Sequence, residues 1–241
     1  MADQYSGFEK IASVREFGKK AYEEGSVKLF TSFPESLTNR FNVSLLGMFR
    51  STPLLWQIHR ITTRFGVETI MADLDFPLHS TVLEAVWEGP AEERESVFSK
   101  TKQAVEVLIA DYAYVSLPRL LEFSDLVLDG SGSLLLMSDT IPEDVIYFRS
   151  CLTSLYVEHG LKVLPLDNML HSTLQRVKVF KDIPFCVDIY PYDPVKVARE
   201  YYYGGVQKIS KDMGRIQFSV TGRYVGPVLG LLNRRPRPES E

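Results

Sequence analysis

Cysteine and histidine are scarce in this sequence, and long hydrophobic runs are absent. Its 241 residues include 2 cysteines and 4 histidines. Cys151 and Cys186 are too few for a disulfide framework and form no metal-ligand pattern, which favours a reducing compartment. No stretch reaches the roughly 18 apolar residues that a membrane span needs, and the first residues lack the apolar segment of a secretory signal. We expect a soluble protein of the cytoplasm, or of the nucleus in a eukaryote.

The chain also lacks a strong charge of either sign. It has 27 Lys and Arg against 31 Asp and Glu, a formal net charge of -4, so no global positive field attracts double-stranded DNA or a membrane surface. Hydrophobic residues make up 45% and charged residues 24%, which is typical of a folded globular chain. A phosphate-bearing ligand would therefore have to be bound by a local group of side chains.

One short sequence occurs twice. Residues 78–82 read Leu-His-Ser-Thr-Val and residues 170–174 read Leu-His-Ser-Thr-Leu. At typical usage, Ser and Thr follow a given His by chance about 0.5% of the time, so two such events among four histidines have a probability of roughly one in ten thousand. Internal repetition explains the match better than chance.

The segments around the two copies predict the same order of elements. The first copy follows a helix that begins behind Pro53 and ends before Gly66, and then a strand over residues 67–71. The second copy follows a helix that begins behind Pro142 and ends before Gly160, and then a short apolar strand. Downstream, the predicted elements are helices over residues 90–113 and 195–203 and hairpins over residues 121–137 and 215–232.

This repeated order predicts an α+β fold with two similar lobes. We expect the lobes to be related by an approximate two-fold axis, with antiparallel sheets that face a central groove. The bilobal domain is expected over residues 51–232, with one His-Ser-Thr motif in each lobe. Residues 1–50 form an N-terminal extension to which the pattern gives no role, and residues 233–241 form a charged, proline-containing flexible tail.

The motifs carry side chains suited to acid-base chemistry. Residues i and i+2 of a strand share a face, so His79 projects with Thr81, and His171 with Thr173. If these faces meet in the groove, one imidazole can serve as a general base and the other as a general acid, while the hydroxyls bind phosphoryl oxygens. The simpler alternative is a pair of structural histidines on half-buried strands.

In these residues the chain resembles the two-histidine (2H) phosphoesterase superfamily, in which a His-x-Thr/Ser-hydrophobic motif occurs twice. The resemblance spans about residues 53–232. It implies metal-independent cleavage of 2′,3′-cyclic or 2′-5′ phosphodiester bonds, with catalytic His79 and His171 and phosphate-binding Thr81 and Thr173. It also suggests a phosphate contact for Arg176. Strict alternation would place Gln175, not Arg176, on the groove face, so this contact requires a bulge in the strand or the end of the strand.

The sequence departs from the superfamily between His and Thr, where a bulky aliphatic residue is usual. Here the residues are Ser80 and Ser172, which weakens the expectation of tightly packed strands at this position.

Other candidate features have simpler interpretations. Tyr202 and Tyr224 could stack on a nucleobase, but aromatic residues in the core or in loops are more common. Asp73 with Asp75 is interpreted as a solvated turn, and residues 130–132 as a hairpin turn rather than a phosphate loop. No metal or other cofactor is expected.

The function predicted from the sequence is a phosphodiesterase whose substrate is a nucleotide, an oligonucleotide or an RNA end. Three alternatives remain open. The same site could trim RNA 3′ ends, it could degrade a cyclic oligonucleotide, or the protein could be a nucleotide-binding module without catalysis.

Overall fold

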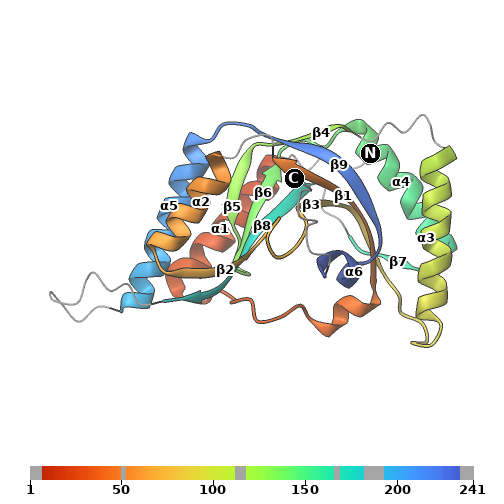
Figure 1. The fold of residues 1–241 in the computed structure, drawn as a ribbon, viewed down its shortest axis with the longest axis horizontal. Helices are drawn as coiled ribbons and strands as arrows, with labels where there is room; N and C mark the ends of the chain where they lie inside the picture. The colour runs from red at the N-terminus through yellow and green to blue at the C-terminus, as the bar shows by residue number, and fades with distance from the viewer. Residues whose placement is uncertain (1–6, 50–52, 112–117, 166–168, 182–192, 234–241) are drawn as a thin grey trace, which may run out of the picture.

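The computed structural model (Figure 1) describes residues 7–49, 53–111, 118–165, 169–181 and 193–233. In chain order the elements are α1 (Gly7–Glu24), the 3-10 helix η1 (Glu35–Asn39), β1 (Arg40–Phe49), α2 (Pro53–Arg64), β2 (Val67–Met71), β3 (His79–Val86), α3 (Arg94–Asp111), β4 (Leu120–Phe123), β5 (Asp125–Leu128), β6 (Ser133–Ser138), α4 (Glu143–Glu158), β7 (Lys162–Val163), β8 (Leu170–Phe180), α5 (Pro194–Asp212), β9 (Ile216–Pro227) and α6 (Val228–Leu232).

The described strands form a strongly curved antiparallel sheet with helices around it, so the predicted α+β class is confirmed (Figure 1). The strand order is β4-β9-β1-β3-β8-β6-β5, and β2 and β7 pair outside this path with β8 and β3. The sequence suggested two separate sheets, whereas these strands make one nine-stranded sheet. The two halves are continuous because Ser80 of β3 pairs with Ser172 of β8.

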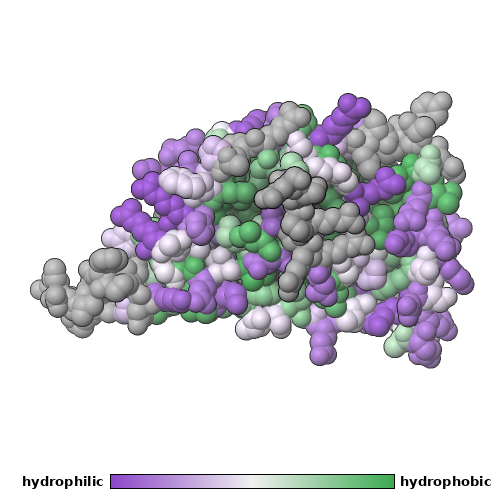
Figure 2. Space-filling view, viewed as in Figure 1, coloured by the Kyte–Doolittle hydropathy of each residue, from purple (hydrophilic) through white to green (hydrophobic). Residues whose placement is uncertain are grey.

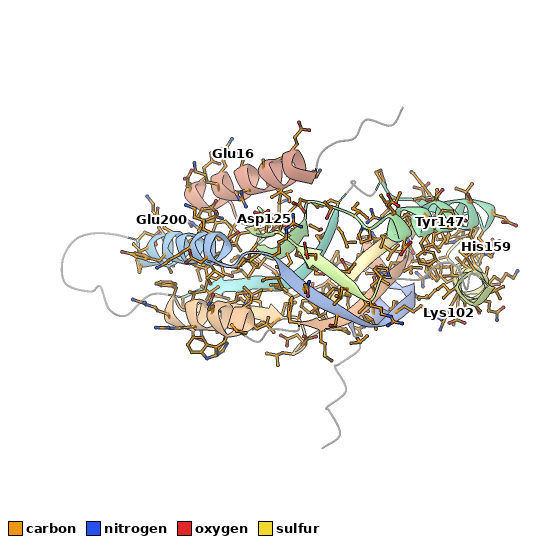
Figure 3. All side chains as sticks on the ribbon, turned by 90° about the horizontal axis from the view of Figure 1, so that it is seen from above. Glu16, Lys102, Asp125, Tyr147, His159 and Glu200 are labelled. Carbon is orange, nitrogen blue, oxygen red and sulfur yellow. The ribbon has the colours of Figure 1, made fainter. Side chains whose placement is uncertain are left out.

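The long helices lie in two groups at opposite ends of the molecule. Helices α1, α2 and α5 pack together at one end, and α3 packs against α4 at the other. Figure 3 shows this separation from above, with Glu16 and Glu200 on the first group and Lys102 and Tyr147 on the second. The middle of the sheet, where β3 meets β8, lies between the two groups.

The two halves of the sheet exchange strands. Strand β2 precedes β3 in the chain but pairs with β8, and β7 precedes β8 but pairs with β3. The preceding helices follow the same exchange, because α2 contacts β2 and α5, whereas α4 contacts β3 and β7. Each half of the sheet is therefore built from both halves of the sequence.

The N-terminal segment contributes to the centre of the sheet. Strand β1 pairs with β3 on one side and with β9 on the other, and Phe41, Val43 and Leu45 are fully buried. Helix α1 packs against β5 and α5. The sequence pattern had given residues 1–50 no role, yet residues 40–49 form a strand beside the first motif.

Several local predictions are confirmed by the helix and strand boundaries. Helix α2 begins at Pro53, and Gly66 takes a positive φ of 61° just beyond its end. Helix α4 begins with two acidic residues, which suit the positive end of the helix dipole, and Gly160 follows its C-cap with a φ of 75°. Strands β5 and β6 form the predicted hairpin, whose turn is closed by the Asp129 carboxylate.

Three boundaries differ from the prediction. Helix α5 continues through Gly204 and Gly205 to Asp212, because burial of Val206 and Ile209 outweighs the cost of about 1 kcal/mol for each glycine. Residues 121–128 are divided between β4, which pairs with β9, and β5, which pairs with β6. Strand β9 runs without a turn to Pro227.

The last predicted strand, residues 228–232, is instead the short helix α6. Its buried residues are Val228, Leu231 and Leu232, a spacing of three and four that suits one face of a helix.

No helix in the described ranges is both long and apolar enough to cross a membrane. Figure 2 shows hydrophilic side chains gathered over the helices at both ends of the molecule, with hydrophobic side chains visible between them.

Candidate functional site

Both His-Ser-Thr motifs face one cavity. Its volume is about 330 Å³, and its lining includes His79, Thr81, His171, Thr173 and Arg176. Small-molecule sites typically occupy about 300–1,000 Å³, so this cavity suits a compact ligand. The cavity thus brings together the four motif side chains that were expected to share a groove. It also includes Arg176, which strict alternation had placed on the opposite face.

The motif side chains show the same pattern of exposure in both strands. In each copy, the His and the Thr are partly exposed to the cavity while the Ser between them is buried. The pattern remains identical over residues 79–85 and 171–177. Alternation along a strand explains the first three positions, because successive side chains point to opposite faces.

A β-bulge then changes the alternation at the same position in each copy. In β3, Val43 and Ser44 pair with Leu83 and Thr81, which leaves Val82 as the extra residue. In β8, the register against β6 leaves Leu174 as the extra residue between Thr173 and Gln175. Each bulge lies three residues after its histidine. It returns the residue five positions after that histidine to the cavity face. That residue is Glu84 in the first copy and Arg176 in the second.

Polar side chains form hydrogen bonds at both bulges. Arg149 of α4 donates from Nε to the Val82 carbonyl at 2.7 Å and from a terminal nitrogen to the Met169 carbonyl at 3.2 Å. Gln175, at the other bulge, donates to Thr62 Oγ1 at 3.3 Å and accepts from the Tyr202 hydroxyl at 2.9 Å. The sequence pattern did not predict these hydrogen bonds, because their partners Thr62, Arg149 and Tyr202 lie on α2, α4 and α5, far from the strands in the chain.

The serines of the two motifs meet where β3 crosses β8. Ser80 and Ser172 are register partners, and both are almost fully buried. The Ser80 hydroxyl donates to the His171 backbone carbonyl at 2.7 Å. This hydrogen bond connects the backbone of the second motif to a side chain of the first motif. The small residue between His and Thr thus allows close contact between the two strands at this pair.

We expect Ser80→Ala to lower the free energy of unfolding by about 1 kcal/mol, since one hydrogen bond is lost. Ser80→Val adds bulk at the crossing and is expected to cost about 1–3 kcal/mol more. Urea unfolding measures both changes. Ser154→Val, on the exposed face of α4, is the matched control and should stay within about 0.5 kcal/mol of the wild type. A Ser80→Val variant as stable as this control would contradict the close crossing.

The hydrogen bond of His79 determines which nitrogen is available to a ligand. Its Nδ1 lies 2.8 Å from the Pro77 carbonyl oxygen. A carbonyl only accepts, so Nδ1 carries the proton and the neutral ring keeps its lone pair on Nε2. Burial lowers the pKa of His79, the Pro77 carbonyl opposes this effect, and the Arg176 charge lowers the pKa further. His79 therefore favours the neutral state.

Arg176 provides the positive charge at one end of the cavity. Its guanidinium lies 5.9 Å from the centre of the Phe33 ring, within the range of a cation-π contact. Burial lowers the pKa of Arg176 while the charge of Asp129 raises it, and a guanidinium remains protonated at physiological pH. Phe33 and Phe30 belong to the segment between α1 and η1, and both line the cavity.

The structure corrects the prediction of base stacking for Tyr202 and Tyr224. Tyr202 is fully buried, burial raises the pKa of its phenol, and its hydroxyl is bonded to Gln175. Tyr224 is 5% exposed, and its hydroxyl donates to the Pro227 carbonyl at 2.7 Å. Neither ring lines the cavity, where Phe30 and Phe33 are the aromatic side chains available to a flat ligand together with Phe76. The sequence pattern did not indicate these rings. Phe30 and Phe33 lie outside the repeated units, and Phe76 lies between the predicted strand over residues 67–71 and the first motif.

The remaining candidates lie away from the cavity and have structural roles. Asp73 and Asp75 close a turn by accepting the backbone N–H groups of Leu78 and Met71. His159 caps α4, and His59 is exposed on α2. Among the residues that the structure describes, no group of three or more His, Cys, Asp or Glu side chains could hold a metal ion.

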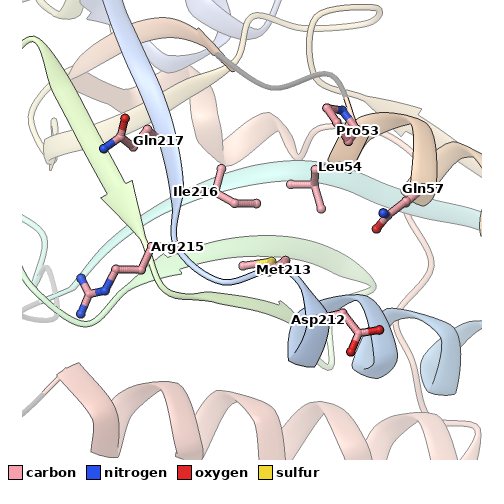
Figure 4. Close-up of a pocket in the computed structure, with 8 residues that line it drawn as sticks. All are labelled: Pro53, Leu54, Gln57, Asp212, Met213, Arg215, Ile216 and Gln217. Atoms are coloured by element: carbon pink, nitrogen blue, oxygen red, sulfur yellow. The ribbon is translucent and has the colours of Figure 1, made fainter.

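A second cavity, of about 400 Å³, lies between the start of α2, the end of α5 and the start of β9 (Figure 4). Its two charged residues are Asp212 and Arg215. Arg215 forms ion pairs with Glu122 and Asp139, and in Figure 4 its side chain points away from Asp212. This cavity offers no pair of groups suited to acid-base catalysis.

The comparisons with known proteins add little to this geometry. No protein-family model matches the chain, and no curated protein matches it significantly in sequence. Among solved structures, Usb1 of Kluyveromyces marxianus matches at 10% identity, with 80% of this chain and 99% of that chain covered and a TM-score of 0.37. The same protein with uridine monophosphate matches at 10% identity and equal coverage, with a TM-score of 0.38.

Proposed function

We propose that this chain is a metal-independent phosphodiesterase that cleaves 2′,3′-cyclic or 2′-5′ phosphodiester bonds in RNA ends or small nucleotides. The observation that carries the proposal is the convergence of His79, Thr81, His171 and Thr173 on one cavity. Two imidazoles and two hydroxyls around a space for a phosphate are the groups that acid-base cleavage at phosphorus requires. The resemblance of the motifs to the 2H superfamily supports the same chemistry.

His79 is the general base in this proposal. Its Nδ1 proton is held by the Pro77 carbonyl, and the lowered pKa keeps Nε2 unprotonated near neutral pH. Nε2 takes the proton of the attacking water or ribose hydroxyl as its oxygen bonds to phosphorus. The bond from phosphorus to the leaving oxygen then breaks, and that oxygen takes a proton from His171. Proton exchange with solvent restores both rings.

The other three side chains stabilise the phosphoryl oxygens. Thr81 and Thr173 donate hydroxyl hydrogens, and Arg176 provides a fixed positive charge as negative charge develops in the transition state. Ser44 Oγ lies 3.4 Å from Thr81 Oγ1 and 3.0 Å from its donor, Asn42 Nδ2. Because Ser44 accepts from Asn42, its own hydrogen is available to Thr81, which leaves the Thr81 hydrogen for the phosphate.

The proposal includes an approximate two-fold relation between the halves of the protein. The repeated motif, the bulge three residues after each histidine and the reciprocal pairing of β2 and β7 support it. On this basis the cavity lies on the two-fold axis, and each half contributes one His and one Thr.

A substrate panel tests the proposal. We expect turnover of 2′,3′-cyclic or 2′-5′ linked substrates at the same rate with and without EDTA, because the site provides its own acid and base. The panel should also contain 3′-5′ linked RNA ends and cyclic oligonucleotides, and products are identified by chromatography. Abolition by EDTA with rescue by Mg²⁺ or Mn²⁺ would overturn the mechanism. Binding without any turnover would instead identify a nucleotide-binding module.

A further inference from the structure

The cavity continues beyond the two motifs into a polar row on β1. Asn42 lines it together with Arg40 and Glu84. Asn42 is the register partner of Glu84, just as Ser44 is the partner of Thr81. Side chains of register partners lie on the same face of a sheet. The polar row of β1 therefore runs beside the first motif and past it.

This polar end is opposite the end that contains Arg176. Strands β3 and β8 are antiparallel and meet at the pair formed by Ser80 and Ser172. Glu84 and Arg176 each follow this pair by four residues, roughly 13 Å of extended chain, and they do so in opposite directions. A ligand whose phosphoryl group lies between the motifs near Arg176 would thus extend its other end toward Asn42 and Glu84.

Asn42 has a buried acceptor without a protein partner. The residue is 2% exposed. Its Nδ2 donates to Ser44 Oγ at 3.0 Å, whereas its Oδ1 is buried without a hydrogen-bond partner in the structure. A buried acceptor without a partner costs about 1–3 kcal/mol. A ligand that donates a hydrogen bond to this oxygen would remove that cost.

Glu84 adds a second set of acceptors at the same end. One carboxylate oxygen accepts from Arg40 at 3.1 Å, and the side chain is 20% exposed. A carboxylate has about four lone-pair positions, so acceptor capacity remains after the Arg40 contact. Two neighbouring acceptors select a ligand edge with at least two N–H hydrogens. They disfavour an edge on which carbonyl oxygens flank a single N–H.

We propose that Asn42 and Glu84 form a subsite for a nucleobase with an exocyclic amino group next to the phosphate site. This inference rests on the proposed function and names its substrate class. Guanine fits best, because its ring N–H and amino group are adjacent donors. Adenine and cytosine provide an amino group, whereas uracil presents one N–H between two carbonyl oxygens. The apolar wall of Leu37, Val228 and Leu232 covers the flat body of the base.

Calorimetric titration of the full chain with the four nucleoside 3′-monophosphates tests the subsite without the need for turnover. We expect guanosine monophosphate to bind at least about 10-fold more tightly than uridine monophosphate, with adenosine and cytidine monophosphates between them. In Asn42→Leu and in Glu84→Gln this ratio should fall below about 3-fold. Glu84 is partly exposed, so its variant tests the subsite even if the buried Asn42→Leu fails to fold.

Two controls separate the subsite from the phosphate site. Gln57→Leu changes an exposed amide on α2 and should keep the wild-type ratio. Arg176→Gln should weaken all four ligands by a similar factor and also keep the ratio. Equal affinity for the four nucleotides, no binding of any of them, or an unchanged ratio in Glu84→Gln would overturn the subsite. Hydrolysis without base preference would support the proposed function and overturn the subsite. Base-selective binding without hydrolysis would support the subsite and overturn the proposed function.

Discussion

Replacing His79 or His171 by alanine is expected to lower kcat by about 10²- to 10⁴-fold on the substrate that the panel identifies. The physical reason is that each imidazole handles a different proton of the same displacement at phosphorus. Without His79, no side chain accepts the proton of the attacking water or ribose hydroxyl. Without His171, no side chain donates a proton to the leaving oxygen. Steady-state kinetics of the two variants at saturating substrate measures the effect.

The double variant and an unrelated histidine make this test specific. His79→Ala/His171→Ala should be little worse than the poorer single variant, because members of one catalytic unit are not additive. His59→Ala, on the exposed face of α2, should retain wild-type kcat. Thr81→Ala and Thr173→Ala should lose about 10- to 1000-fold, as expected for one oxyanion donor. Full activity in either single histidine variant would contradict the assignment.

The sequence predicted which motif side chains share a face, and the structure brings them to one cavity. Alternation along a strand is a local property, so His79 with Thr81 and His171 with Thr173 could be paired without knowledge of the fold. The repeat then suggested that the two pairs converge. Local signals also predicted the helices behind Pro53 and Pro142 and the hairpin at Asp129, because prolines, glycines and capping carboxylates act within a few residues.

The features that the sequence did not predict depend on long-range contacts. A bulge in the second motif strand was one condition under which Arg176 would face the groove. Its position at Leu174 and the matching bulge at Val82 depend on pairing with β6 and β1, and Arg149 of α4 donates a hydrogen bond to the Val82 carbonyl. The exchange of β2 and β7 between the halves cannot be detected from hydrophobic periodicity, which does not identify partners. Asn42 lies in a segment outside the repeat, so nothing in its local pattern connected it with the motifs.

The pH dependence of kcat/KM should be bell-shaped, because one imidazole must be neutral and the other protonated. The acid limb reports protonation of the base. Burial lowers the pKa of His79 from 6.5, and the positive charge of Arg176 lowers it further. His79 therefore stays neutral at pH values at which a free imidazole would be protonated, and the acid limb is expected below pH 6.5. A profile that is flat from about pH 5 to 9 would exclude a pair of titrating histidines.

The variant Arg176→Gln tests the direction in which the acid limb of the pH profile moves. The Arg176 cation opposes protonation of His79, so its removal raises the pKa of His79, and the acid limb should move to higher pH. The same variant loses the positive charge beside the phosphate, so kcat/KM should also fall across the whole profile. Arg60→Gln removes an exposed arginine on α2 and should change neither the limb nor the height. Profiles of the three proteins at constant ionic strength measure both effects. An acid limb that moves to lower pH in Arg176→Gln would rule out His79 as the base, because loss of a nearby cation can only make protonation of that ring easier.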